Sequence, residues 1–87
     1  MRPVDVLEQV RRQPFVPLLV RLSNGREYLI RHPDQIIVER SSLHIANPAP
    51  DLPPGVYDST DIVSLLHVAQ IIPTPGVAAP GGNGPAS

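Results

Sequence analysis

The chain has 87 residues, a net charge of −1 at neutral pH and no cysteine. This length allows one small domain, and the lack of cysteine excludes disulfide scaffolds, cysteine-bound zinc, iron–sulfur ligation and thiol catalysis. Proline accounts for 12 residues, more than twice its usual share of about 5%, so part of the chain is predicted to be loop.

The charge is unevenly distributed. Residues 1–46 hold all seven arginines and five acidic residues, whereas residues 47–87 hold three aspartates and no base. The only basic run is Arg11-Arg12, so general polyanion binding is not expected and any nucleic-acid contact would be local. The longest apolar stretches fall well short of the ~20 residues of a membrane-spanning helix. We therefore expect a cytoplasmic protein that does not contact a membrane.

The first predicted element is a helix over residues 3–13. Pro3 suits a first helical turn, and Val4, Leu7 and Val10 repeat with helical spacing. Pro14 ends the helix.

Alternating apolar residues over 16–22 and 26–31 predict two strands. Between them, Asn24-Gly25 predicts a hairpin with a type I′ turn. His32-Pro33-Asp34 ends the second strand, and apolar runs predict further strands over 35–40 and 43–46.

Residues 47–58 contain four prolines and are predicted to form a loop. Residues 60–72 fit either a helical stripe or strands, because the segment is rich in β-branched residues. We favour a strand over 60–64, a 3₁₀ turn over 65–67 and a strand over 69–72. Residues 74–87 are dominated by proline and glycine and are predicted to be disordered. The folded domain is therefore expected over residues 1–73.

These elements predict a mainly β protein: an N-terminal α-helix followed by a five-stranded SH3/Sm-like small barrel. A domain this small lies near the lower limit of independent stability, and its short strands leave edges exposed. Pairing of edges between identical subunits would relieve both problems, so self-association is expected.

Two resemblances extend this interpretation. The motifs Pro-Phe-x-Pro (residues 14–17), Asn-Gly-Arg (24–26), His-Pro-Asp (32–34) and Leu-Leu-x-Val-x-x-Ile (65–71) resemble a family of small bacterial proteins with an Sm-like β-barrel and no assigned function. That resemblance supports the strand, turn and strand over 60–72.

The second resemblance is to the Sm-like RNA chaperone Hfq. It is carried by Arg11-Arg12 before the first strand, by Leu22-Ser23-Asn24-Gly25, by Asp34-Gln35-Ile36 and by the segment from His67 to Pro73. Hfq-like rings bind uridine-rich RNA, so this similarity implies RNA contacts by a set of eight residues: Arg11, Arg12, Asn24, Gly25, Arg26, Asp34, Gln35 and His67.

The sequence also departs from the Hfq pattern. Ile36 stands where that family has an aromatic residue that stacks on a base, an interaction of about 1–3 kcal/mol. Leu66 stands in place of a lysine, and Ile30 in place of a glycine that permits strand bending. The comparison also requires a closed barrel, and an open arrangement of sheets would remove its basis.

Catalytic and metal chemistry find little support. No two of His32, His44 and His67 have metal-ligand spacing, so neither a metal nor another cofactor is expected. His32 and Asp34 flank Pro33, which suits turn chemistry better than acid–base catalysis. No serine lies in a nucleophile elbow, so we expect a non-enzymatic protein.

His67 fits either a packed core histidine or a ligand contact, Arg26 a turn residue or a nucleic-acid contact, and Arg11-Arg12 a solvated helix end or a phosphate-binding rim. Two functional classes follow. One is an RNA-binding, Hfq-like oligomer. The other is a protein-interaction module or a structural subunit, which the acidic C-terminal half and the proline-rich segments favour.

Overall fold

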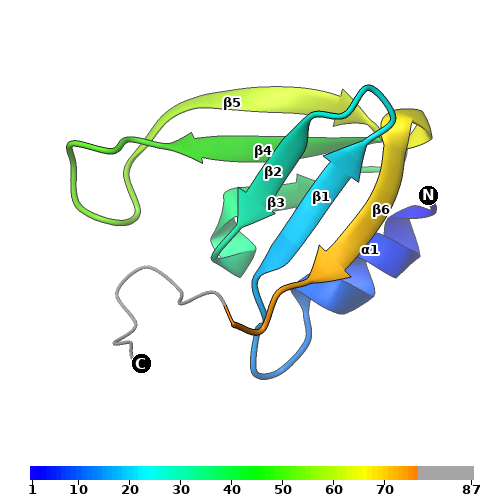
Figure 1. Ribbon diagram of the computed structural model, residues 1–87, viewed down its shortest axis with the longest axis horizontal. Coiled ribbons are helices and arrows are strands. Elements are labelled where there is room, and N and C mark those ends of the chain that lie inside the picture. The colour runs from blue at the N-terminus through cyan, green and yellow to red at the C-terminus, as the bar shows by residue number, and fades with distance from the viewer. Residues whose placement is uncertain (77–87) are drawn as a thin grey trace.

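The computed structural model describes residues 1–76, which form one short helix and two three-stranded antiparallel sheets (Figure 1). In chain order, the elements are α1 (Pro3–Val10), β1 (Leu18–Leu22), β2 (Glu27–Ile30), the 3₁₀ turn η1 (Pro33–Gln35), β3 (Ile36–Val38), β4 (Ser42–Pro48), β5 (Tyr57–Ser64), the 3₁₀ turn η2 (Leu65–His67) and β6 (Val68–Pro73). The prediction of a mainly β protein with an N-terminal helix is confirmed.

The first sheet has the order β2-β1-β6. In the central strand, Leu18, Val20 and Leu22 are buried while the residues between them are partly exposed. This is the alternation that the sequence predicted, because successive side chains of a strand point to opposite faces. On the outer face, Arg21 donates to the Glu27 carboxylate at 2.8 Å and to the Gln70 amide oxygen at 3.0 Å, which ties all three strands together.

The second sheet has the order β3-β4-β5. Its central strand supplies Leu43 and Ile45, which are fully buried and face Val63 and Asp61 of β5. On the outer face, the imidazole of His44 lies in register with Ile37 on one side and Ile62 on the other. The inner faces of the two sheets share one hydrophobic core.

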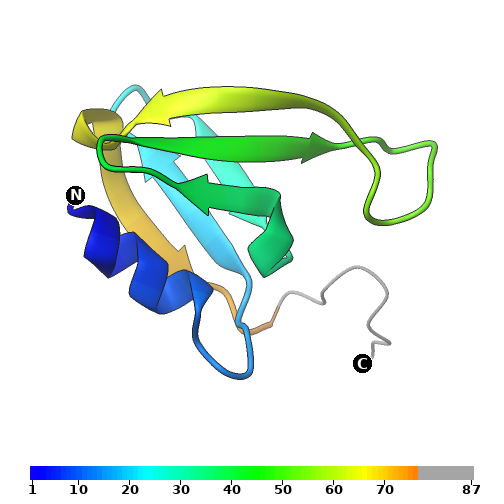
Figure 2. The same cartoon turned by 180° about the vertical axis from the view of Figure 1, so that it is seen from behind.

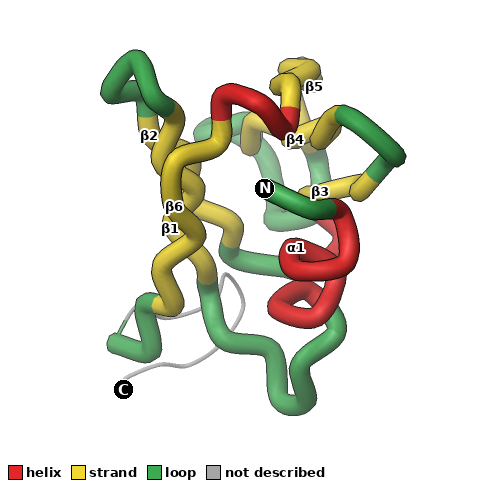
Figure 3. The backbone as a smooth tube through the Cα atoms, turned by 90° about the vertical axis from the view of Figure 1, so that its right-hand side faces the viewer, coloured by secondary structure: helices red, strands yellow, loops and turns green. Residues whose placement is uncertain are grey.

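Helix α1 lies on the side of the molecule where β6 and β3 run, and it packs against β3 (Figures 2 and 3). Val6 is its buried residue and Val10 is packed on the core, whereas Val4 is exposed. The helix ends at Val10 with Arg11 as its C-cap, three residues earlier than predicted.

The β1–β2 hairpin differs from the type I′ prediction. Its loop has three residues, Ser23 to Gly25, because Leu22 lies opposite Arg26: its N–H donates to the Arg26 carbonyl at 2.8 Å. The Gly25 N–H closes a turn on the Leu22 carbonyl at 3.0 Å, and Gly25 has φ +89°. This is a type I turn followed by a bulge at a left-handed glycine, so only the glycine needs positive φ.

The prediction of a closed five-stranded barrel is wrong. The described residues form six strands in two sheets, and no backbone ladder joins β2 to β5 or β3 to β6. Closure needs strands that continue from one sheet into the other. Here β2 stops at Ile30 and β3 starts at Ile36, because Pro33 carries no N–H for a ladder and begins η1 instead.

The interpretation of residues 60–72 as strand, turn and strand is confirmed. Strand β5, turn η2 and strand β6 follow one another, and the Ser64 hydroxyl accepts the Leu66 N–H at 3.2 Å to start the turn. Thr74 is still held by the sheet, since its N–H donates to the Pro17 carbonyl at 2.8 Å. The rest of the predicted disordered segment, from residue 77 onward, lies outside the described residues.

Candidate binding grooves along the open edges

Two strand edges face each other where the sheets fail to join. A side-chain bridge links them: the Tyr28 hydroxyl of β2 donates to the Asp61 carboxylate of β5 at 2.7 Å. The Arg26 guanidinium lies 3.4 Å from the same carboxylate oxygen and 5.2 Å from the centre of the Tyr28 ring. Side chains therefore do here what a backbone ladder would do in a closed barrel.

The bridge shifts the acidity of both partners. The hydrogen bond from Tyr28 lowers the pKa of Asp61, and Asn47 and Arg26 add to this effect, while partial desolvation opposes it. Burial raises the pKa of the Tyr28 hydroxyl, and its hydrogen bond to the Asp61 carboxylate raises it further. At neutral pH the bridge is therefore a neutral phenol bound to a carboxylate.

The register shows which backbone groups are free. In an antiparallel pair, residues alternate between those that hydrogen-bond their opposite residue and those whose groups point away. Since the Leu65 N–H donates to the Ser41 carbonyl, Asp61 and Val63 of β5 bond to β4, and Thr60 and Ile62 present their backbone groups at the outer edge. On β2, the bond from the Leu22 N–H to the Arg26 carbonyl sets the same alternation, so Glu27 and Leu29 present their backbone groups at the outer edge.

The bridge separates two grooves. The first, which we call the hairpin groove, has a volume of about 890 Å³ and is bordered by the β1–β2 turn, the end of β5 and η2. It brings together three of the predicted site residues, Asn24, Arg26 and His67. The Ser23 N–H donates to the His67 carbonyl at 2.8 Å, which fixes η2 against the turn. His67 is exposed, so its interpretation as a packed core histidine is wrong.

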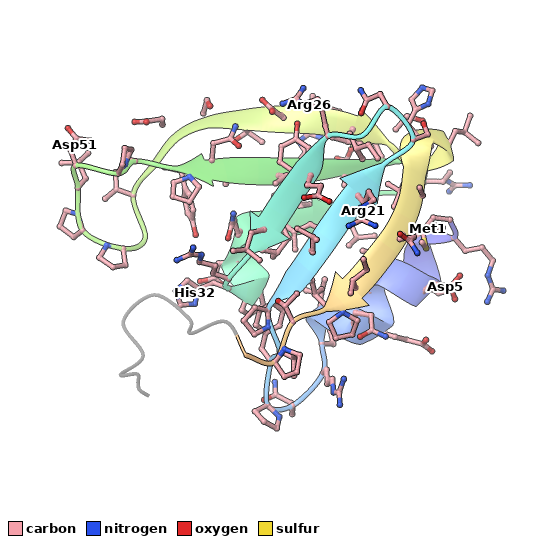
Figure 4. All side chains as sticks on the ribbon, in the orientation of Figure 1. Met1, Asp5, Arg21, Arg26, His32 and Asp51 are labelled. Atoms are coloured by element: carbon pink, nitrogen blue, oxygen red, sulfur yellow. The ribbon has the colours of Figure 1, made fainter. Side chains whose placement is uncertain are left out.

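The second, which we call the loop groove, has a volume of about 630 Å³ and runs between the edge of β2 and the proline-rich loop. Arg31 and His32 line it from one side, and prolines with Leu52 and Val56 line it from the other. Figure 4 shows Arg26 and His32 toward opposite ends of β2, with Asp51 at the far tip of the loop.

Gln35 is buried, and its side chain is hydrogen-bonded to the backbone. It is only 4% exposed, and its amide nitrogen donates to the carbonyls of Leu29 and Ala46, each at 3.0 Å. Its amide oxygen accepts the Arg31 N–H at 2.9 Å. One side-chain amide thus acts like a peptide group that joins the edge of β2 to β4.

The other predicted site residues are scattered. Gly25 lies in the hairpin turn, and Asp34 is exposed in η1, at the other end of β2 from the hairpin groove. Arg11 and Arg12 are exposed at the end of α1. The structure therefore assembles the hairpin residues with His67 and leaves the two remaining pairs, Arg11-Arg12 and Asp34-Gln35, apart from them.

A further feature is apolar exposure beside the hairpin groove. Ile62 in β5 is 69% exposed and Leu66 in η2 is 89% exposed. Ile62 lies in the edge strand β5 itself, and Leu66 lies in the turn that directly follows this strand. Large apolar side chains gathered at an unpaired strand edge are typical of an association surface.

Comparisons with known proteins do not place the chain in a family. No protein-family model matches it, and neither a curated protein nor a solved structure shows significant similarity. Within residues 1–76, no three or more His, Asp or Glu side chains gather in a way that could hold a metal ion. In the same part of the chain, no helix has both the length and the apolar character to cross a bilayer.

Sequence reasoning missed the bridge and the loop groove. Alternation places Tyr28 on the inner face of β2, but no local pattern links it to Asp61, 33 positions further along the chain. The signal that could have revealed the bridge was the carboxylate of Asp61 at an inward position of a predicted strand, since a partly buried carboxylate needs a partner.

Proposed function

We propose that this protein is a non-enzymatic interaction module that associates with copies of itself through the β5 edge. In this proposal the fold is an SH3/Sm-like arrangement opened between β2 and β5. The order of elements along the chain supports this description of the fold: an N-terminal helix comes first, then a hairpin, and a 3₁₀ turn precedes the last strand.

One observation carries the proposal. Strand β5 has outward-facing backbone groups at Thr60 and Ile62 and the exposed side chain of Ile62, and the turn η2 that follows it adds the exposed side chain of Leu66. An unpaired edge of this kind is a template for pairing with another strand. The edge has no proline between Tyr57 and Ser64 to prevent such pairing.

Light scattering across a concentration series tests self-association. We expect a mass that is a multiple of the 9.4 kDa chain and that falls to one chain in Ile62→Glu. The matched control is Leu52→Glu, which places the same charge at an apolar position of comparable exposure, 50%, in the proline-rich loop. A monomeric wild-type chain, or equal masses for wild type and Ile62→Glu, would contradict the proposal.

RNA binding is the second candidate, and the hairpin groove favours it. Asn24 and Arg26 of the hairpin turn line this groove together with His67 of η2, which is distant in the sequence. The open sheets remove the basis of the comparison with Hfq, so this candidate depends on the groove alone. The Arg26 guanidinium is also engaged with Asp61, which leaves the groove without a concentrated positive charge.

Filter binding of oligo-uridine and oligo-adenosine at two salt concentrations tests this candidate. Phosphate contacts strengthen as salt falls, so we expect binding at low salt that weakens in Arg26→Ala. Arg40→Ala is the control, because it removes the same charge from the exposed turn before β4. No binding at low salt, or equal loss in both variants, would exclude RNA recognition by the groove.

A further inference from the structure

We propose that the loop groove binds an extended acidic peptide, which adds as a strand to the outer edge of β2. Its lining shares Tyr28 with the hairpin groove, which borders the end of β5 proposed for self-association. The loop groove is formed by β2, η1 and the loop between β4 and β5.

The edge of β2 offers backbone groups to such a strand. Glu27 and Leu29 alternate with Tyr28 and Ile30, which bond to β1, so their N–H and C=O groups point into the groove. The Leu29 carbonyl already accepts a hydrogen bond from the amide nitrogen of Gln35, and the Arg31 N–H already donates to the amide oxygen of Gln35. Both groups of Glu27 and the Leu29 N–H remain for a ligand, which is enough for a short ladder.

The opposite wall explains why the groove is open. Pro48, Pro50, Pro53 and Pro54 line it and carry no N–H, so the loop cannot complete a ladder with β2. The wall is apolar and also includes Leu52 and Val56. An extended chain alternates its side chains between two sides, so every second residue of the ligand would meet this wall.

Charge complementarity selects an acidic ligand. Glu27 is the carboxylate that lines the groove, and it is already paired with Arg21 at 2.8 Å. Arg31 and His32 also line the groove, and neither forms an ion pair within the described residues. Among the groups that line the groove, Arg31 therefore carries a positive charge that no ion pair within the described residues compensates.

The test uses the full chain, labelled with ¹⁵N, and a terminally blocked heptapeptide in which valine alternates with glutamate. We expect amide shifts centred on Glu27, Leu29 and Arg31. The same peptide with lysine for glutamate should bind at least about tenfold more weakly, because like charges would meet at Arg31. A peptide with N-methyl groups on alternate residues should not bind, because it cannot form the ladder.

Arg31→Glu should reverse the charge preference, while Arg40→Glu, an exposed arginine in the turn before β4, should keep it. A melting curve of each variant confirms that it is folded. Equal binding of the glutamate and lysine peptides, no binding of either, or shifts centred on β5 would overturn the proposal. Peptide-induced shifts of amides in residues 77–87 would point to displacement of the chain's own segment, which would overturn the assignment to a separate partner.

Discussion

Gln35 joins chain segments that no backbone ladder connects. Its side-chain amide makes three hydrogen bonds to backbone groups at the edge of β2 and in β4, and it is almost fully buried. A buried backbone group without a partner costs about 1–3 kcal/mol. The residue therefore matters to the stability of the fold, whatever the surface binds.

We expect Gln35→Ala to lower the free energy of unfolding by about 3 kcal/mol, because it leaves three backbone groups unpaired. Urea denaturation followed by circular dichroism measures this change. The control is Gln70→Ala, which removes an amide that accepts from Arg21 on the exposed outer face and should have an effect within about 0.5 kcal/mol. Equal effects of the two substitutions would contradict the structural role.

The Tyr28–Asp61 bridge makes stability depend on pH at both extremes. The lowered pKa of Asp61 gives stability that is present above its unfolded value near 3.8 and is lost as pH falls through the folded value. The raised pKa of Tyr28 gives stability that is present below its unfolded value near 10 and is lost as pH rises through the folded value.

We expect the urea midpoint of the wild type to fall at acid pH and again at alkaline pH, with a flat region between. Tyr28→Phe should remove the alkaline fall and reduce the acid one, because it removes the titrating hydroxyl and the bond that lowers the pKa of Asp61. Tyr57→Phe serves as the control, since within residues 1–76 no hydrogen bond joins the hydroxyl of Tyr57 to a carboxylate. An unchanged alkaline fall in Tyr28→Phe would show that another group causes it.

At the scale of elements, the β1–β2 hairpin shows how one glycine sets a turn. Gly25 has φ +89°, and no atom outside its chain neighbours lies within 4 Å of the position a Cβ would take. The Asn24 side chain supports the same turn by accepting the Arg26 N–H at 2.9 Å. Backbone conformation, and not lack of space, therefore requires glycine at this position.

Gly25→Ala should destabilise the protein by about 1 kcal/mol, because alanine is strained at positive φ. Gly76→Ala is the matched control: that position is equally open and its φ lies outside the positive range. Thermal unfolding of both variants measures the difference. A loss in Gly76→Ala as large as that in Gly25→Ala would contradict the backbone explanation.

At the scale of the whole molecule, the open edge between the sheets makes a direct prediction for hydrogen exchange. The amides of Tyr28 and Ile30 bond to β1, whereas those of Glu27 and Leu29 face the loop groove. We expect the first pair to exchange slowly and the second pair to exchange fast. Equal protection of all four amides would mean that β2 is paired on both sides, as in a closed barrel.

Neighbouring residues in the chain were enough to predict the local elements. Alternation defined β1, the β-branched residues favoured strands on both sides of η2, and Asn24-Gly25 placed a turn, because each signal depends on neighbours in the chain. The predicted type of this turn was wrong. Asn-Gly occurs both in two-residue and in three-residue hairpin loops, and these loops differ in how the flanking strands pair.

How the sheets meet, and which side chains lie at their edges, depends on contacts between segments that are distant in the chain. Pro33 marked a break in the sequence, but whether the strands beside it form one bent ribbon or belong to two sheets depends on pairing with β1 and β4. The same pairing brings Tyr28 to Asp61, turns Gln35 into a buried link and gathers Asn24, Arg26 and His67 in one groove. The bond between Tyr28 and Asp61 joins residues 33 positions apart, and no local pattern encodes a distance between segments that only the packing of a shared core brings together.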